Sequence, residues 1–296
     1  MPDEIDEPAR TRTGWSPRGA ASPDGAVRTA RERAVRSGGV SKNRTVIAVI
    51  AVVAFFVLVA VAVVIAPSLL GPSVPQSPSA SGPLLADSFS RQFSGGWGTP
   101  DSGPAWVAAG GAAEAASVDG NSGQLSISTA PGSQFERVSL VAADLDISAR
   151  FSLDALPAGV PVTIHFWPRT VDAGNQYRFY VTLTPAGDLF GTFSAVVDGT
   201  GSALGQATRL GSAYSAGSWW HLRVQASGSG PTSLRARAWL DGTPEPQTWA
   251  LELTDSTASL QAPSQAVQLG IYAAAGETQL PLHVAFDDVQ ITAATP

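Results

Sequence analysis

The chain has 296 residues, a formal net charge of −6 and no cysteine, which excludes disulfides, thiolate nucleophiles and cysteine-ligated metals. The charge is uneven, because residues 1–44 hold nine of the 18 Lys and Arg but only six of the 24 acidic residues. The remaining chain is therefore acidic, which argues against nucleic acid as a partner, since nucleic acid requires a basic surface.

Residues 1–44 form the first predicted segment. They mix Pro, Gly, Ser, Thr and Arg with few large apolar residues, so they cannot bury enough surface to fold. We expect a disordered basic tail. This tail precedes an apolar segment that is a candidate membrane span. Because the basic flank of a span lies on the cytoplasmic side, we expect a cytoplasmic N-terminus and an extracytoplasmic C-terminal part.

The second predicted segment, residues 45–66, contains the run from Val46 to Ala66, which has no polar or charged side chain. A helix of this length extends about 32 Å, close to the thickness of a bilayer core. A cleavable signal peptide is the alternative, but its apolar core is usually about 7 to 15 residues and its charged region is short. An uncleaved, single-pass signal anchor in the cell membrane is the better interpretation.

Residues 67–83 contain five prolines together with Ser and Gly, which is typical of an extended stalk. From residue 84 to residue 296 the apolar residues alternate with period two, which indicates strands with one buried face. The alternation is clear in the ranges 147–153, 160–166, 177–183, 189–197, 220–226, 234–240, 267–273 and 282–286. Many antiparallel strands in one region predict two packed sheets, that is, an all-β sandwich or jelly roll.

Several segments of residues 84–294 resemble a known family. The opening stretches 87–91, 95–98 and 101–106 and the closing stretches 234–239, 254–260 and 284–289 are similar to the concanavalin A-like (laminin G-like) jelly-roll domains of bacterial surface and phage tail proteins. The resemblance implies an antiparallel β-sandwich. It does not imply one activity, since lectins, glycan-binding modules, adhesion modules and glycoside hydrolases share this fold.

Large aromatic, Arg and His side chains occupy the positions that alternate with the apolar ones. Aromatic rings stack on sugars, and Arg and His donate hydrogen bonds to hydroxyl or carboxylate groups. These residues therefore predict a sheet face that binds a glycan, and anionic glycans are among the candidates. The alternative is a solvated sheet in which Arg and Trp pair by cation–π contacts. The candidate residues are His165, Trp167, Arg178, Tyr180, Trp219, His221, Arg223, Arg237 and Trp239.

Two tryptophans near the start of the domain, Trp97 and Trp106, lie among glycines, a setting that favours packing at one end of a sandwich over sugar contact. Asp87 near the first strand and Asp287 and Asp288 in the last would come close if the terminal strands are neighbours, as the resemblance implies. Carboxylates suit Ca²⁺, so these three residues are candidates for a structural calcium site. Ordinary strand-end aspartates are the alternative, and no other cofactor is predicted.

Catalytic motifs are not recognisable. Glycosidases of this fold often carry Glu-x-Asp-x-x-Glu on a strand, and no segment of the chain matches it. The three histidines are too scattered for a zinc site. We therefore expect a membrane-anchored, non-catalytic module of a bacterial envelope that binds cell-surface or wall polysaccharide. A protein-binding adhesion or assembly scaffold is the second hypothesis, and a diverged glycoside hydrolase is the third.

Overall fold

The computed structural model describes residues 82–294. The predicted tail, span and most of the stalk lie outside the described residues, so these three remain predictions. Within residues 82–294 no helix is long and apolar enough to cross a membrane.

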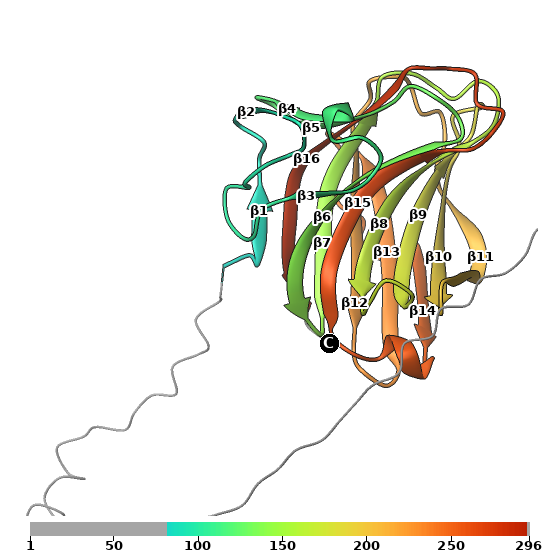
Figure 1. Ribbon diagram of the computed structural model, residues 1–296. Coiled ribbons are helices and arrows are strands. Elements are labelled where there is room, and N and C mark those ends of the chain that lie inside the picture. The colour runs from blue at the N-terminus through green and yellow to red at the C-terminus, as the bar shows by residue number, and fades with distance from the viewer. Residues whose placement is uncertain (1–81, 295–296) are drawn as a thin grey trace, which may run out of the picture. The chain divides into compact units, whose positions relative to one another are not determined.

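The described residues form two antiparallel sheets packed face to face, with only two short 3₁₀ helices, Ala113–Ala115 and Ala258–Leu260. Figure 1 shows the seven-stranded sheet in front of the nine-stranded sheet. This confirms the predicted all-β sandwich.

The seven-stranded sheet has the order β11-β10-β9-β8-β15-β6-β3. Its strands are β3 (Val107–Gly110), β6 (Gly132–Ala142), β8 (Val162–Thr170), β9 (Gln176–Leu183), β10 (Leu189–Val197), β11 (Thr200–Gly211) and β15 (Ser264–Ala273).

The nine-stranded sheet has the order β14-β13-β12-β7-β16-β5-β4-β2, and β1 pairs with β16. Its strands are β1 (Leu85–Asp87), β2 (Gln92–Ser94), β4 (Ala116–Asp119), β5 (Gly123–Ile127), β7 (Leu145–Leu153), β12 (Trp220–Ser227), β13 (Thr232–Leu240), β14 (Leu251–Asp255) and β16 (Leu282–Ala293).

The apolar residues that alternate in the sequence fill the space between the sheets. Phe166 on β8 and Phe286 on β16 meet across this interface, with ring centroids 5.9 Å apart in an edge-on arrangement. Such aromatic pairs add about 0.5–1.5 kcal/mol beyond their burial. Side chains at alternate positions therefore point outward from both sheets, and these outward positions carry the candidate site residues.

The packing role predicted for the two early tryptophans is confirmed. Trp97 is fully buried and Trp106 nearly so. Trp97 packs edge-on against Trp106, with centroids 5.0 Å apart, and against Phe286 at 5.4 Å. The two rings close one end of the core, so neither presents a face to a ligand.

Candidate functional site

The nine candidate glycan-binding residues lie on opposite faces of the sandwich. His165 and Trp167 on β8 and Arg178 and Tyr180 on β9 belong to the outer face of the seven-stranded sheet. The other five lie on or directly before β12 and β13, on the outer face of the nine-stranded sheet: Trp219, His221, Arg223, Arg237 and Trp239. The sequence pattern therefore marked two separate surfaces.

On the outer face of the nine-stranded sheet, the arginines are paired with carboxylates. Nε of Arg223 donates to both oxygens of Asp146, at 3.0 and 2.9 Å, and its Nη1 donates to Glu245 at 3.1 Å. Glu245 also forms an ion pair with Arg237 Nη2, at 2.5 Å. The bond to Asp146 raises the pKa of Arg223 above its ordinary value, although burial opposes the shift. These charges are already neutralised within the protein.

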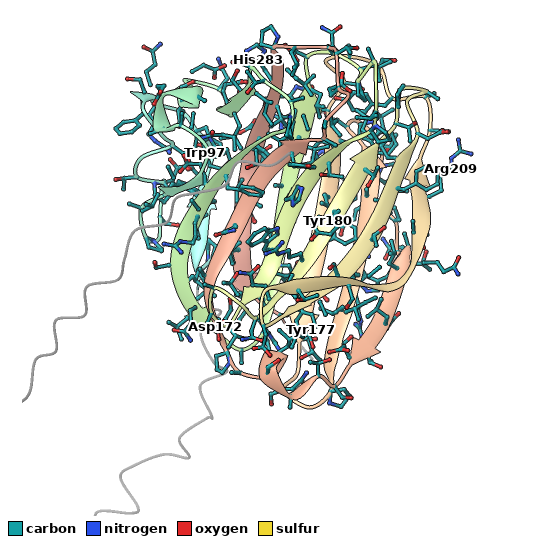
Figure 2. All side chains as sticks on the ribbon, turned by 45° about the vertical axis from the view of Figure 1, so that its right-hand side comes forward. Trp97, Asp172, Tyr177, Tyr180, Arg209 and His283 are labelled. Carbon is teal, nitrogen blue, oxygen red and sulfur yellow. The ribbon has the colours of Figure 1, made fainter. Side chains whose placement is uncertain are left out.

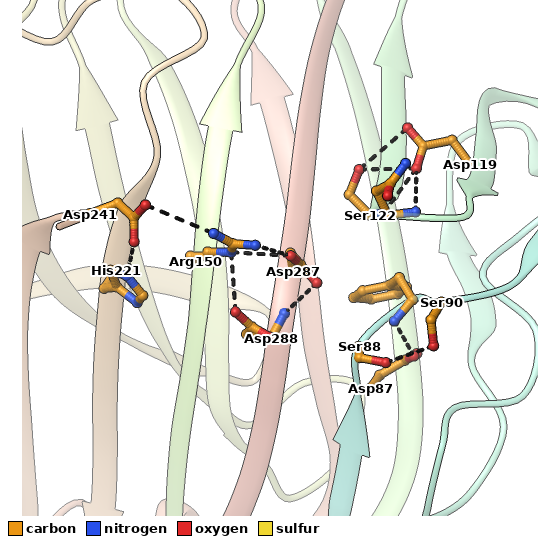
Figure 3. Close-up of polar contacts among 12 residues, drawn as sticks. Asp87, Ser88, Ser90, Asp119, Ser122, Arg150, His221, Asp241, Asp287 and Asp288 are labelled. Carbon is orange, nitrogen blue, oxygen red and sulfur yellow. Dashed lines mark hydrogen bonds and ion pairs between the residues drawn. The ribbon is translucent and has the colours of Figure 1, made fainter.

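The rest of this face follows the same rule. Arg150 forms ion pairs with Asp287 and with Asp288, the latter at 3.2 Å, as Figure 3 shows. The ring of His221 stacks on Trp239 with centroids 5.0 Å apart, and its Nε2 lies 2.7 Å from Asp241. A cavity of about 460 Å³ lies here, lined by His221, Arg223 and Trp239 among others. Its polar groups are largely engaged with one another.

A second pocket, of about 540 Å³, lies over the outer face of the seven-stranded sheet. We call it the β6–β9 pocket; the residues that matter for its chemistry are Phe135, Arg137, Trp167, Asp172, Arg178 and Gln268. Figure 2 shows this face with Tyr180 near its middle and Asp172 toward its lower end.

The floor of the β6–β9 pocket is aromatic. Phe135 lies across Gly270 on the neighbouring strand, so close that a Cβ at position 270 would meet Cδ1 of the ring at 2.1 Å. The same ring packs against His165 and Trp167, with centroid distances of 5.2 and 5.3 Å. Trp167 is only 8% exposed, whereas Phe135 is partly exposed. A ligand in this pocket would therefore meet Phe135 first.

His165 supports the floor rather than the ligand. Its Nδ1 accepts from Trp167 Nε1 at 3.4 Å, so Nε2 carries the proton and donates to Thr163 Oγ1 at 2.8 Å. Burial, with a smaller effect of Arg178, lowers the pKa of His165 to about 3. The imidazole is neutral at neutral pH and both of its nitrogens are already hydrogen-bonded.

Arg178 crosses the pocket above Trp167. Its guanidinium carbon lies 3.9 Å from the ring centroid, and its Nε donates to Gln176 Oε1 at 2.7 Å. Within residues 82–294 neither Arg178 nor Arg137 forms an ion pair, in contrast to Arg150, Arg223 and Arg237 on the opposite sheet. The β6–β9 pocket therefore holds two arginines without a carboxylate partner in the described part of the chain.

Carboxylates are scarce around this pocket. Asp172 is the single acidic residue among those that line it, and it accepts hydrogen bonds from the Gly174 N–H at 2.7 Å and from Asn175 Nδ2 at 3.0 Å. Glu136 belongs to β6 but is fully buried in the core. The lining therefore does not contain the two carboxylates that most glycoside hydrolases place around the scissile bond.

The three aspartates predicted to bind calcium are each engaged in other contacts. Asp87 accepts from Arg91 at 2.6 Å and from Trp106 Nε1 at 2.8 Å, while Asp287 and Asp288 contact Arg150. Within residues 82–294 no cluster of three or more His, Cys, Asp and Glu residues could hold a metal ion. The geometry of these residues does not support a calcium site, and the site stays a prediction.

Phe135, Arg137 and Gln268 were missed by the sequence analysis. Phe135 and Arg137 lie on β6, whose buried positions include Gln134 and Glu136, so the apolar alternation that reveals a strand is interrupted there. The available signal was the pair Phe135 and Arg137, an aromatic and a basic residue two positions apart. Arg178 and Tyr180 on β9 form a pair of the same kind.

The comparisons with known proteins bear on the fold. No protein-family model matches the chain, and no curated protein matches its sequence. An endo-acting O-glycanase of the human gut microbiota has a similar structure, with 14% identity, a TM-score of 0.50, and coverage of 72% of this chain and 100% of the glycanase chain. The fold is a jelly-roll β-sandwich. At this identity the likeness shows the fold alone.

Two further structures are similar at lower scores. A Bacillus licheniformis β-glucanase has 15% identity and a TM-score of 0.49, covering 73% of this chain and 100% of the glucanase. The alginate lyase Aly36B, solved with an alginate tetrasaccharide, has 11% identity and a TM-score of 0.48, covering 72% of this chain and 98% of the lyase.

These findings correct one prediction. The sequence analysis expected a module without catalytic activity because no catalytic motif was found. That inference was wrong, because the O-glycanase that shares the fold is an enzyme, so the fold itself is compatible with catalysis. The Glu-x-Asp-x-x-Glu motif is frequent but not universal among glycosidases of this fold, so its absence does not decide against catalysis.

Proposed function

We propose that the jelly-roll domain binds a glycan in the β6–β9 pocket. The observation that carries the proposal is the partly exposed ring of Phe135, held over Gly270 and against Trp167, at the floor of a pocket of about 540 Å³ with Arg137, Arg178 and Gln268 around it. An aromatic platform surrounded by hydrogen-bond donors suits a sugar ring, which presents apolar faces and a polar edge.

The pocket on the nine-stranded sheet is the weaker candidate. His221 is stacked on Trp239 and bonded to Asp241, and Arg223 is shared between Asp146 and Glu245, so a ligand would have to break existing contacts. The β6–β9 pocket instead holds two arginines, Arg137 and Arg178, that have no carboxylate partner within residues 82–294. A protein-binding scaffold, the second hypothesis from the sequence, has no specific observation in its favour.

A glycan array with the full-length chain, purified in mild detergent, tests the proposal. We expect Phe135→Ala to weaken binding at least tenfold, because the sugar platform is lost. Phe93→Ala is the matched control, since Phe93 is 47% exposed on β2, in the other sheet. Trp239→Ala should also leave binding unchanged. Loss of binding with Trp239→Ala and not with Phe135→Ala would move the site to the nine-stranded sheet.

A second experiment tests for catalysis. The glycans that bind on the array are incubated with the chain in solution, and their sizes are then measured by chromatography. Shorter products that disappear with Phe135→Ala would show that the same pocket cleaves its ligand. Intact glycans would leave binding as its activity.

The cellular location is part of the proposal. We propose that the apolar run Val46–Ala66 anchors the chain in a cell membrane with the sandwich on the extracytoplasmic side. Protease added to intact cells should degrade the sandwich and spare the N-terminal tail. A sandwich that stays protected until the cells are lysed would contradict this orientation.

A further inference from the structure

The arginines of the nine-stranded sheet and those of the β6–β9 pocket differ in whether they form ion pairs. On the nine-stranded sheet, Arg150, Arg223, Arg235 and Arg237 each form an ion pair with Asp or Glu. On the seven-stranded sheet, Arg209 of β11 pairs with Asp188, whereas Arg137 and Arg178, which line the β6–β9 pocket, form no ion pair within residues 82–294. The difference lies at the very site proposed for the glycan.

A shortage of carboxylates does not explain the unpaired arginines. Beyond residue 44 the chain carries 18 acidic residues against nine basic ones. Yet the outward positions of β6, β15, β8 and β9 around the pocket include no Asp or Glu. These outward positions include Phe135, Arg137, Gln268, Trp167 and Arg178. The one carboxylate at the pocket, Asp172, lies in the loop after β8 and accepts hydrogen bonds from Gly174 and Asn175 of the same loop.

Arg178 is held ready for an anion. The Trp167 ring lies beneath its guanidinium group, and the bond from Nε to Gln176 fixes the rotation of the side chain. The terminal Nη1 and Nη2 groups have no hydrogen-bond partner in the described part of the chain. These two nitrogens form the fork that binds a carboxylate or sulfate through two parallel hydrogen bonds.

The second arginine extends the basic surface along one line. Arg137 on β6 is opposite Gln268 on β15, and Gln268 is opposite Trp167 on β8, which is covered by Arg178 of β9. Three strand spacings separate the two arginine backbones, about 14 Å. Two positive charges at this separation suit a polymer that carries repeated negative charges better than they suit a single small anion.

We infer that the ligand of the β6–β9 pocket is an acidic polysaccharide, whose carboxylate or sulfate groups bind Arg178 and Arg137 while a sugar ring lies against Phe135. The inference rests on the proposed glycan-binding function and specifies the class of glycan. Nucleic acid, the other common polyanion, is disfavoured by the low pI of the chain, about 5.0, and by its excess of acidic residues.

Two matched polymer pairs test the inference with the full-length chain in mild detergent. Polygalacturonate and its fully methyl-esterified form share one backbone and differ in carboxylate charge, and dextran sulfate and dextran differ in sulfate. We expect at least tenfold tighter binding of the charged member in one pair, weakening as salt rises from 50 to 500 mM. The pair that shows the difference identifies the anionic group.

Variants then assign the charge to the pocket. We expect Arg178→Gln to weaken binding of the charged polymer about tenfold or more and Arg137→Gln to weaken it several-fold, because each substitution removes a charged hydrogen-bond donor. Arg178→Lys should give an intermediate loss, because it keeps the charge but not the fork. Arg235→Gln on the opposite sheet is the control, and thermal melting checks that each variant is folded.

The outcomes separate the two proposals. Equal binding of charged and neutral members, or full binding by Arg178→Gln, would overturn the acidic ligand while leaving glycan binding intact. Failure to bind either polymer pair or any glycan of the array would overturn both.

Discussion

The guanidinium carbon of Arg178 lies 3.9 Å from the ring centroid of Trp167 on the outer face of the seven-stranded sheet, and the two residues come from neighbouring strands, β9 and β8. The contact orients a guanidinium group that has no carboxylate partner within residues 82–294. A cation–π contact of this kind contributes about 0.5–2 kcal/mol and restricts the side chain before a ligand arrives.

Trp167→Phe should separate orientation from charge. The smaller ring supports Arg178 less well, so we expect the affinity for the charged polymer to fall about three- to tenfold. The number of positive charges is unchanged, so the dependence of affinity on salt should stay as in the parent chain. Arg178→Gln should instead flatten the salt dependence. Titration at several salt concentrations distinguishes the two; a flattened salt dependence in Trp167→Phe would contradict the orienting role.

Gly270→Ala should disturb the sugar platform without changing any polar group. A Cβ at position 270 would meet the Phe135 ring at 2.1 Å and the Gln134 carbonyl oxygen at 2.5 Å, so Phe135 has to move. We expect weaker glycan binding, by about tenfold, and a lower melting temperature. Gly201→Ala on β11 is the control, since its Cβ would meet no atom closer than 3.8 Å. Unchanged glycan binding in Gly270→Ala would show that the position of Phe135 is irrelevant.

Glu136 predicts an unusual pH dependence of stability. It is fully buried, neither carboxylate oxygen forms a hydrogen bond of normal geometry within residues 82–294, and burial raises its pKa from 4.5 to about 7, although the nearby Trp97 N–H opposes the shift. The folded state therefore binds a proton more tightly than the unfolded state, so stability falls as the pH rises from about 4.5 to 7.

Glu136→Gln removes this titration. We expect the variant and the parent chain to melt at similar temperatures at pH 5, where Glu136 is protonated, and the variant to melt on the order of 5 °C higher at pH 8. Glu114→Gln, at an exposed position, serves as the control. If the difference in melting temperature between Glu136→Gln and the parent chain stays the same from pH 5 to pH 8, the pKa of Glu136 is not raised by burial and the prediction is wrong.

Arg169 should be the arginine whose loss is most damaging to the fold. It is 1% exposed and donates to Thr232 Oγ1 at 2.7 Å, to the Gly228 carbonyl at 3.0 Å, to the Leu260 carbonyl at 3.3 Å, and to the Ala143 carbonyl. These groups join β8 of one sheet to turns at the end of the other. Arg169→Met leaves buried acceptors unpaired.

We expect Arg169→Met to lower the free energy of unfolding by about 3 kcal/mol or more, measured by chemical denaturation. Arg209→Met is the matched control, because Arg209 is 56% exposed and pairs with Asp188 at the surface, where an ion pair contributes about 0–1 kcal/mol. Equal destabilisation by the two substitutions would refute the proposed role of Arg169.

Glu277 links two loops at one end of the sandwich. Its carboxylate accepts from the N–H groups of Ala158, Val160, Thr278 and Gln279, at 2.9, 3.3, 2.9 and 2.6 Å. Burial alone would raise the pKa of Glu277, but the four donors outweigh it and the pKa lies below its ordinary value. The stabilisation is present above the unfolded pKa of about 4.5 and is lost as the pH falls through the lower folded pKa.

Glu277→Gln should lower the free energy of unfolding by about 2 kcal/mol at pH 7, because the amide NH₂ group faces an N–H donor. The variant should also lose less stability than the parent chain between pH 5 and pH 3. Glu252→Gln, at an exposed carboxylate that pairs with Arg235, is the control. A steeper acid loss in the variant than in the parent chain would contradict the assignment.

The sequence was sufficient to predict the sandwich, because apolar and polar residues alternate along a strand that has one buried and one exposed face. Eight apolar ranges predicted β7, β8, β9, β10, β12, β13, β15 and β16. Others were missed for physical reasons. The inward positions of β6 include Gln134 and Glu136, and β11 is mostly exposed, so neither strand has an apolar period.

The site depended on tertiary structure. His165 and His221 have similar surroundings in the sequence, next to aromatic residues at alternating positions, yet they lie on opposite sheets, and the former is buried and hydrogen-bonded on both nitrogens. Strand order decides this, since it depends on pairings between residues far apart in the chain, which no local pattern encodes.

The amino-acid sequence by itself determined which residues face outward, where the acidic and basic charges lie along the chain, and that the second part folds as an all-β sandwich. Only the tertiary structure decided which outward residues share a pocket and which arginines have partners. Arg223 and Arg178 occupy similar alternating strand positions, but cross-strand pairing gives Asp146 to the first and a tryptophan face to the second. Ion pairing is a short-range interaction, so it is fixed by the strands that fold side by side.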